Sequence, residues 1–176
     1  LRWLLYVLGG IAVVFVGLVL YARYVIGVNA PLGGGELDPS LLANRIQLPD
    51  GFSLGVFASD IPDARTLRFS RAGDLLAVNP SRGTITLLRD ADGDGKAEQR
   101  RVVIEGLNGP NGLDFLDDWL YIAETDAIGR VSFDHAEGVT VGSYERLVTG
   151  LPAGGNHWKK TLRVGPDGML YVTMGS

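Results

Sequence analysis

The chain has 176 residues, including 25 glycines, 8 prolines and no cysteine, and its formal net charge is -4. The lack of cysteine excludes disulfides and thiolate metal sites. The mild acidity argues against a nucleic-acid partner, because phosphate binding needs a clustered basic face. The length suits one domain. The chain begins at Leu1 and stops at Ser176 inside a patterned segment, so we expect a fragment of a longer protein.

The first segment is an uncharged run of nineteen residues from Trp3 to Tyr21. A helix of this length spans roughly 28 Å, close to the hydrocarbon core of a bilayer. A cleaved signal peptide is one alternative, although its apolar region is usually shorter, at about 7–15 residues. A buried soluble helix is another, and it fits badly at an extreme terminus. We therefore predict a transmembrane anchor over residues 1–27, a linker over 28–46 and a periplasmic or extracytoplasmic location for the remainder.

From Leu48 onward, short apolar runs are separated by Gly, Asp, Asn and Pro, which predicts an all-β domain. Three of its segments share one pattern of strand, tight polar turn and second strand. Their anchor leucines, Leu67, Leu113 and Leu162, are 46 and 49 residues apart. Regular spacing of this kind indicates an internal repeat.

A second landmark precedes each anchor, at Ile61, Leu107 and Leu151, with spacings of 46 and 44 residues. Two further predicted strands, Thr84–Arg89 and Gly129–Phe133, lie between the landmarks. Four strands in a repeat of about 45 residues correspond to one blade of a β-propeller. A β-sandwich with coincidental spacing is the alternative, and the agreement of two landmarks favours the propeller.

The segment Phe52–Ile61 aligns with the outermost strands, yet it precedes the first innermost strand. We therefore expect it to be a strand that completes a blade outside this chain. The predicted domain is residues 47–176, the N-terminal portion of a propeller, with about two and a half blades and a truncated end.

In a propeller, the loops that enter each innermost strand lie at the mouth of the central channel, together with the loops between second and third strands. The third such entry loop has five more residues than the two before it and contains Gly154, Gly155, Asn156 and His157. An enlarged loop at a concave mouth is an expected position for a site. This position favours a functional role for His157 over a structural one.

The same geometry places further polar side chains at this face. Ordinary solvated loop residues are the alternative for most of them, and Trp158 could pack under the loop instead of stacking on a sugar ring. The substrate-binding candidates are Arg65, Asn111, Glu124, Asn156, Trp158 and Lys160.

The stretch Asp90–Glu98, "DADGDGKAE", has alternating carboxylates around glycines. Hard oxygens at this spacing can surround one Ca²⁺ ion, so the predicted ligands of a structural calcium are Asp90, Asp92, Asp94, Glu98 and the Lys96 carbonyl. Arg101 occupies the twelfth position, where an EF-hand has Glu, and no helices flank the loop; both features argue against an EF-hand. A metal-free hairpin turn remains an equal alternative, because Asp and Gly are favoured turn residues.

The segment "NHWKKTLRVGPDGMLYVTMG", Asn156–Gly175, resembles a motif of the glucose/sorbosone dehydrogenase family. The segments "LPDGFSLGVFASDIPDARTLRFS", "RDADGDGKAE" and "EGLNGPNGLDF" are similar to its sorbosone-dehydrogenase branch, and the similarity covers about residues 46–176. The members are six-bladed propellers that use pyrroloquinoline quinone (PQQ) to oxidise sugars.

This resemblance implies an oxidoreductase acting on a sugar or a sugar-derived aldehyde. It implies that His157 is the general base, which takes the proton of the substrate hydroxyl as hydride leaves for the quinone. Imidazole suits this role because its ordinary pKa is near neutral. Asn156 stands where better-known relatives have an acidic residue. The residues that hold the quinone in the family belong to later blades, so the resemblance assigns no cofactor-binding residue here.

Two other classes of function are considered. One is a non-catalytic propeller that binds a protein or a carbohydrate. The other is a propeller lactonase or hydrolase with a metal at the channel, which we rank lower because the predicted channel positions hold no tight cluster of carboxylates. The electron acceptor and the substrate are not identified by the sequence.

Overall fold

The computed structural model describes residues 12–18, 21, 46–154 and 158–175, and it divides into the units Leu1–Leu37 and Asp38–Ser176. In the first unit, residues 12–18 and 21 are helical and exposed. Within the described part of the chain, no helix has the length and apolarity needed to cross a membrane. Most of the predicted anchor at 1–27, and residues 28–45 of the predicted linker, lie outside the described residues.

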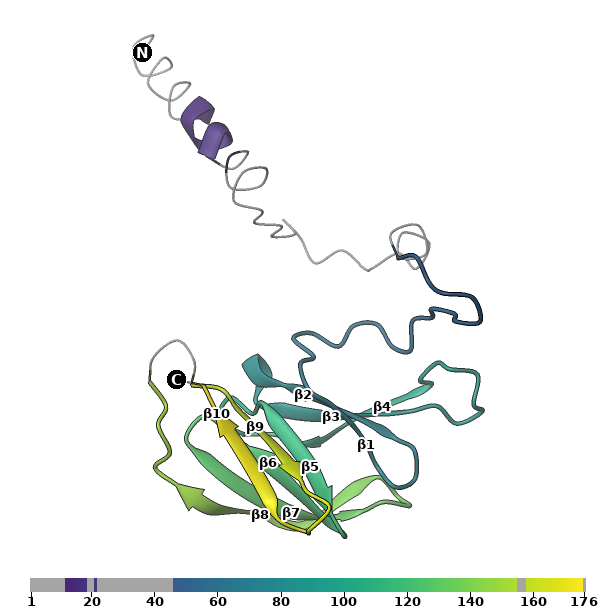
Figure 1. Ribbon diagram of the computed structural model, residues 1–176, viewed down its shortest axis with the longest axis vertical. Helices are drawn as coiled ribbons and strands as arrows, with labels where there is room; N and C mark the ends of the chain where they lie inside the picture. Colours follow the sequence, from purple (N-terminus) through teal and green to yellow (C-terminus); the bar gives the residue numbers. More distant parts are fainter. Residues whose placement is uncertain (1–11, 19–20, 22–45, 155–157, 176) are drawn as a thin grey trace. The chain divides into compact units, whose positions relative to one another are not determined.

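The second unit consists of two four-stranded antiparallel sheets and a two-stranded hairpin (Figure 1). Each sheet is a meander in which consecutive strands are neighbours, as in a propeller blade. The first sheet contains β1 (Leu67–Phe69), β2 (Leu75–Asn79), β3 (Thr84–Arg89) and β4 (Gln99–Ile104), with the 3₁₀ turn η1 (Pro80–Arg82) between β2 and β3. The second sheet contains β5 (Gly112–Leu116), β6 (Trp119–Ala123), β7 (Ala127–Asp134) and β8 (Val139–Thr149), and the C-terminal hairpin contains β9 (Lys160–Val164) and β10 (Leu170–Met174).

The expected all-β class and the repeat of four strands are therefore confirmed, and the architecture is propeller-like. The register agrees as well, because Leu67, Leu113 and Leu162 each pair across the first hairpin of their repeat. The number of blades in a closed ring stays a prediction.

The segment Phe52–Ile61 forms no strand within this chain, and the blade that it is expected to complete lies outside the chain, so this expectation stays a prediction. Extended backbone becomes a β-strand only when a partner strand accepts and donates its hydrogen bonds. Here the segment makes isolated contacts instead: the Ala97 amide donates to Phe57 O, and Arg100 donates to Ser59 O and Asp60 O.

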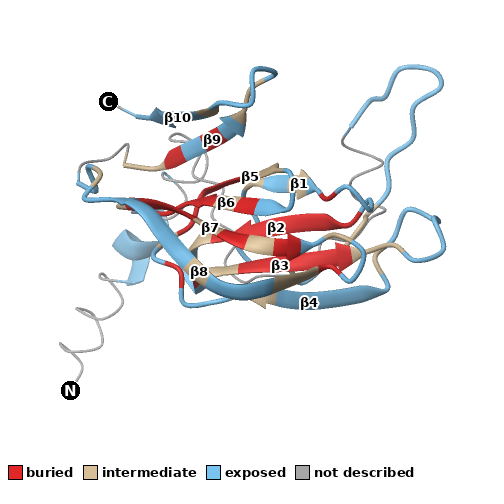
Figure 2. Ribbon diagram, turned by 90° about the horizontal axis from the view of Figure 1, so that it is seen from below, coloured by how far each residue is buried: buried red, intermediate tan, exposed pale blue. Residues whose placement is uncertain are grey.

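The main hydrophobic core lies between the first and second sheets. Both sheets present β-branched and aliphatic side chains to it, while most of β4 and β8 remains exposed on the outer side (Figure 2). Its buried members are Leu76, Val78, Ile85, Leu87, Leu107, Leu113, Leu120, Ile122, Val131 and Phe133. A smaller cluster of Ala123, Ile128 and Leu162 packs the hairpin against the second sheet.

The first strands of the three repeats, β1, β5 and β9, are joined by the carboxylate of Asp114 on β5. Its Oδ1 accepts a hydrogen bond from Arg68 Nε on β1 at 2.6 Å, and its Oδ2 accepts one from the Val164 amide on β9 at 2.9 Å. The Asp114 side chain is 1% exposed, so these charge-assisted bonds form away from water. The residue that follows the anchor leucine is Arg68 in the first repeat, Asp114 in the second and Arg163 in the third. Its charge thus alternates from one repeat to the next.

Gly112 allows β5 and β9 to approach each other closely. A Cβ at this position would lie 2.8 Å from Leu162 N, closer than real Cβ atoms approach a neighbour, and 3.1 Å from Lys160 O. The close approach places the start of β5 directly beside the start of β9, where the predicted site residues lie.

The Asp114 bridge predicts a large loss of stability when its carboxylate is removed. In the full-length protein, Asp114→Ala should lower the free energy of unfolding by about 2–4 kcal/mol, because buried N–H groups lose their acceptor and Arg68, which is 39% exposed, is only partly rehydrated. Chemical denaturation measures the change. Asp118→Ala is the matched control, since this carboxylate is 73% exposed and its ion pair contributes little. Equal losses in the two variants would contradict the bridge.

Candidate functional site: the loops at the top end

The loops that the sequence places at the channel mouth do gather at one end of the sheets. The Leu107 amide donates to Gly83 O at 3.0 Å, the Thr125 amide to Asn108 O at 2.9 Å, and the Leu151 amide to Asp126 O at 2.9 Å. These bonds connect the β2–β3, β4–β5, β6–β7 and β8–β9 loops, which together we call the top end. The predicted grouping of loops is therefore confirmed within the described residues.

Asn111 lies at the start of β5 and is 5% exposed. Its Nδ2 donates to Lys160 O at 3.2 Å, and its main-chain oxygen accepts a hydrogen bond from Thr66 Oγ1 at 2.5 Å. These bonds link the starts of β1, β5 and β9. The Asn111 Oδ1 atom is buried and has no hydrogen-bond partner among the described residues. A buried carbonyl oxygen of this kind can accept a hydrogen bond from a ligand or a water molecule.

Glu124, in the β6–β7 loop, is 3% exposed and both of its carboxylate oxygens are used within the protein. Oε2 accepts a hydrogen bond from the Asn108 amide at 2.6 Å, and Oε1 accepts from Tyr144 Oη and Arg146 Nε, each at 3.0 Å. Burial and the neighbouring Glu124 charge raise the pKa of the Tyr144 hydroxyl far above its usual value. Glu124 therefore connects the β6–β7 loop to the β4–β5 loop and to β8.

Lys160, the first residue of β9, is 1% exposed. Its ammonium donates to three main-chain carbonyls: Thr125 O at 2.5 Å, Pro152 O at 2.6 Å and Trp158 O at 2.9 Å. A lysine ammonium has three donors, and all of them are used here. The alternative of an ordinary solvated loop residue is therefore wrong for Asn111, Glu124 and Lys160, because each of them is buried and hydrogen-bonded within the protein.

The remaining predicted residues differ in position. Arg65 is exposed, and its amide donates to Val78 O at 3.0 Å. The half-buried Trp158 ring lies about 3.7 Å from where a Cβ of Gly109 would be, so it packs partly against the β4–β5 loop. Asn156 and His157 lie outside the described residues. The structure thus brings Asn111, Trp158 and Lys160 together.

The other histidine, His135, lies at the opposite end of the sheets. Its Nδ1 accepts a hydrogen bond from the Arg71 amide at 3.2 Å, and its Nε2 is 3.2 Å from Asp117 O. The ring also packs on Phe115 and Phe133, with centroid separations of 4.7 and 5.3 Å. Both nitrogens are engaged, so His135 is structural.

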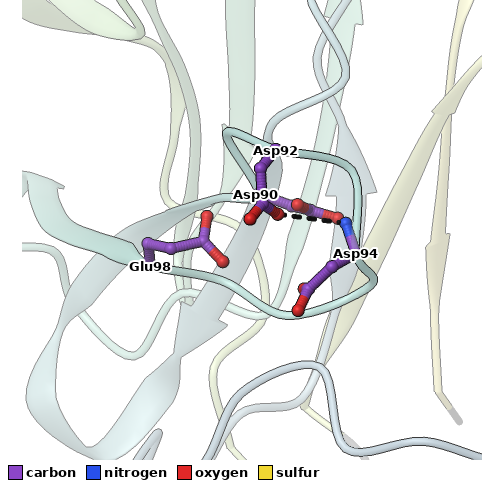
Figure 3. A group of neighbouring side chains, drawn as sticks. All are labelled: Asp90, Asp92, Asp94 and Glu98. Carbon is purple, nitrogen blue, oxygen red and sulfur yellow. Dashed lines mark hydrogen bonds between the residues drawn. The ribbon is translucent and has the colours of Figure 1, made fainter.

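The acidic loop joins β3 to β4 at the end of the first sheet opposite the top end. Oxygens of Asp90, Asp92, Asp94 and Glu98 lie within 4.8 Å of one another, and Figure 3 shows the Glu98 carboxylate directed toward the three aspartates. Oxygen ligands at such separations fit a hard cation such as Ca²⁺. The donor set that the sequence predicted is therefore gathered in space.

Hydrogen bonds hold this loop in its curved shape. Asp90 accepts from the amides of Gly93 and Gly95 at 2.7 and 2.9 Å, and Glu98 Oε2 accepts from the Ala91 amide at 2.7 Å. Both glycines have positive φ, 77° and 87°, which the turn requires. These internal bonds would also hold a metal-free turn.

Two basic side chains near the loop have distinct positions. Lys96, whose carbonyl was predicted as a ligand, has its ammonium 3.8 Å from Asp94 Oδ2. Arg101 donates to Glu137 O and Gly138 O of the second sheet, at 2.7 and 2.8 Å. The residue at the twelfth position of the loop therefore connects two sheets, in agreement with the argument against an EF-hand.

Asp114 and the Tyr144–Arg146 pair that holds Glu124 were not among the residues predicted from the sequence. The alternation of Arg68, Asp114 and Arg163 after the anchor leucines was an available signal for Asp114. No comparable signal existed for Arg146, which ion-pairs with both Glu124 and Asp126 across a strand pairing.

Comparison with solved structures supports the fold. The chain is similar to the PQQ domain of pyranose dehydrogenase from Coprinopsis cinerea in its holo form, with 21% identity, a TM-score of 0.56, and coverage of 63% of this chain and 27% of that one. It is also similar to the calcium structure of the Trichoderma reesei Carbohydrate-Active Enzymes Family AA12 protein, with 17% identity, a TM-score of 0.58, and coverage of 68% and 30%. A third is the PQQ-bound aldose sugar dehydrogenase from Streptomyces coelicolor, with 23% identity, a TM-score of 0.51, and coverage of 69% and 40%.

The chain thus matches between 27% and 40% of the length of these proteins. Comparison with curated proteins gave no match. A family model described as TrAA12-like matches residues 46–176, which comprise both sheets and the hairpin. The resemblance to quinone-dependent sugar dehydrogenases is confirmed at the level of family, and the chain belongs to the TrAA12-like family.

Proposed function

We propose that the full-length protein is an oxidoreductase that oxidises a sugar or a sugar-derived aldehyde with PQQ as cofactor. The observation that carries the proposal is the TrAA12-like match across residues 46–176. The PQQ-bound pyranose and aldose sugar dehydrogenases of similar fold support it. When bound, the quinone would accept the hydride that leaves the substrate carbon.

In this proposal, His157 is the general base. Its imidazole takes the proton of the substrate hydroxyl, so that the electron pair of that O–H bond can form the new carbonyl bond as hydride leaves the carbon. The proton remains on the imidazole until solvent removes it. The electron acceptor that later reoxidises the cofactor is not assigned.

The top end fits a polar ligand through a small number of groups. Glu124 and Lys160 are satisfied within the protein, whereas Asn111 Oδ1 is a buried acceptor without a partner among the described residues. We therefore assign Asn111 the role of accepting a hydrogen bond from the sugar or the cofactor, and Trp158 that of packing against a ring. Arg65 and Asn156 complete the proposed substrate-binding set. Residues that hold the quinone itself are not assigned.

We also propose that the acidic loop binds Ca²⁺ as a structural ion. Four carboxylates converge there, and one similar protein is described as a calcium structure. Because the loop lies at the opposite end from the top-end loops, the ion would stabilise the first sheet and would take no part in the reaction.

Finally, we propose that residues 1–27 anchor the protein in a membrane, with the sheets on the periplasmic or extracytoplasmic side. The uncharged run from Trp3 to Tyr21 is the feature that supports this proposal.

His157→Ala in the full-length protein should reduce substrate-dependent dye reduction by about 10²–10⁴-fold, the usual loss for a missing general base. Binding of PQQ, measured by titration of the apoprotein, should be nearly unchanged. His135→Gln is the control, because this histidine is structural and distant, and its turnover should remain close to wild type. Near-normal turnover in His157→Ala would contradict the assignment.

Calcium should raise the melting temperature of the full-length protein, since an ion that binds only the folded state stabilises it by about 2.7 kcal/mol at one hundred times its Kd. Asp92→Asn with Asp94→Asn should remove this rise with little effect on intrinsic turnover. The control variant, Asp117→Asn with Asp118→Asn, removes the same charge from an exposed turn. Calcium should still raise the melting temperature of this control. If calcium leaves the wild-type melting temperature unchanged, the loop is only a turn.

The full-length, uncleaved protein should remain in the membrane fraction after alkaline carbonate extraction, because a spanning helix resists treatment that removes peripheral proteins. Protease added outside spheroplasts should digest the sheet domain. Release of the intact protein would contradict the anchor, and protection of the domain would contradict the orientation.

A further inference from the structure

Lys160 is a buried cation that has no carboxylate partner among the described residues. None of the ion pairs formed by the described residues includes it. Lysine is almost never fully buried unless its charge is compensated, since the ammonium loses its hydration. Here the compensation comes from three carbonyl dipoles at 2.5–2.9 Å. A lysine held in this way does more than fill space, because an apolar side chain could fill the same volume without desolvating a charge.

The three acceptors come from two loops. Pro152 and Trp158 stand on either side of residues 153–157 in the β8–β9 loop, and Thr125 belongs to the β6–β7 loop of the second sheet. One ammonium therefore holds both stems of the β8–β9 loop to each other and to the neighbouring sheet. Lysine suits this role because its donors rotate freely on a flexible stem, so that they can meet carbonyls from different directions.

Neighbouring contacts fix the same junction from other sides. The Leu151 amide donates to Asp126 O, and Asn111 Nδ2 donates to Lys160 O. Gly109 has φ of +53°, and a Cβ there would lie 2.5 Å from Thr125 Oγ1. The main chain of Lys160 is thus already fixed by β9 and Asn111, which leaves its side chain to fix the loop stems.

We propose that Lys160 is a positioning residue: its ammonium fixes the stems of the β8–β9 loop, and so sets where that loop presents its side chains to the substrate. Trp158 is a described member of this loop, and His157 precedes it in the sequence. The inference rests on the proposed function for its catalytic consequence. The effect on the loop stems is independent of that function.

The loop effect is tested by hydrogen–deuterium exchange on the full-length apoprotein. Lys160→Met removes the three donors and keeps a side chain of similar length, so amides of residues 151–159 should exchange at least tenfold faster while those of β6 and β8 keep their rates. Lys159→Met is the matched control: it changes an adjacent lysine whose ammonium is 5.8 Å from the Trp158 ring, and it should leave loop exchange unchanged. Unchanged loop exchange in Lys160→Met would overturn the proposal.

The catalytic effect is tested by steady-state kinetics of the PQQ-loaded protein. A misplaced loop should lower kcat by about tenfold to a hundredfold with a smaller change in KM, since small displacements of reacting groups are costly. In a His157→Ala background, Lys160→Met should lower kcat less than threefold. A positioning residue acts through the group it positions, and that group is already absent there. An equal loss in both backgrounds would overturn the proposal in favour of a general structural role.

Lys160→Arg covers the case in which Lys160→Met fails to fold. Arginine keeps a cation with several donors, so this variant should fold and confine any faster exchange to residues 151–159. Faster exchange throughout the second sheet would overturn the proposal. If His157→Ala itself retains turnover, the proposed general base fails, whereas a loop-confined change in exchange would still support the positioning of the stems.

Discussion

The buried carboxylate of Asp114 is the interaction on which the arrangement of the three repeats depends. It accepts hydrogen bonds from Arg68 of the first sheet and from the Val164 amide of the hairpin, while its own strand lies between them. A single charge that is shared in this way requires β1, β5 and β9 to remain side by side. Removal of water from the bridge strengthens each bond and makes alternative placements of the strands costly.

The close packing of first strands extends to the top end and determines which polar residues there are buried and which remain free for the proposed substrate. Gly112 lets β5 approach β9, and this approach buries Asn111 and Lys160 beside each other. Glu124 is neutralised by Arg146 and its hydrogen bonds. Glu124 and Lys160 therefore form a frame for the loops, and the proposed ligand-facing roles fall to Arg65, to the Asn111 oxygen that has no partner among the described residues, and to the β8–β9 loop.

The two ends of the sheets differ in their chemistry. At the end opposite the top-end loops, Arg89 pairs with the buried Asp74, His135 has both nitrogens engaged, and the carboxylates of Asp90–Glu98 converge. All of these contacts stabilise turns or join sheets. Loss of the proposed structural calcium at one end should therefore leave the proposed reaction at the other end unaffected. Their tests use separate readouts for this reason.

The sequence alone predicted most of the fold, because strand alternation and turn residues are local signals. The leucines at 67, 113 and 162 and the turn glycines indicate a four-strand repeat even before the pairing of the strands is known. It also predicted the acidic loop, whose carboxylates are close neighbours in the chain. The expectation for Phe52–Ile61 stays a prediction, since a strand requires hydrogen-bonding partners and those expected for this segment lie outside this chain. Only the tertiary structure revealed that Asn111, Glu124 and Lys160 are buried, because their burial depends on residues that are distant in the sequence.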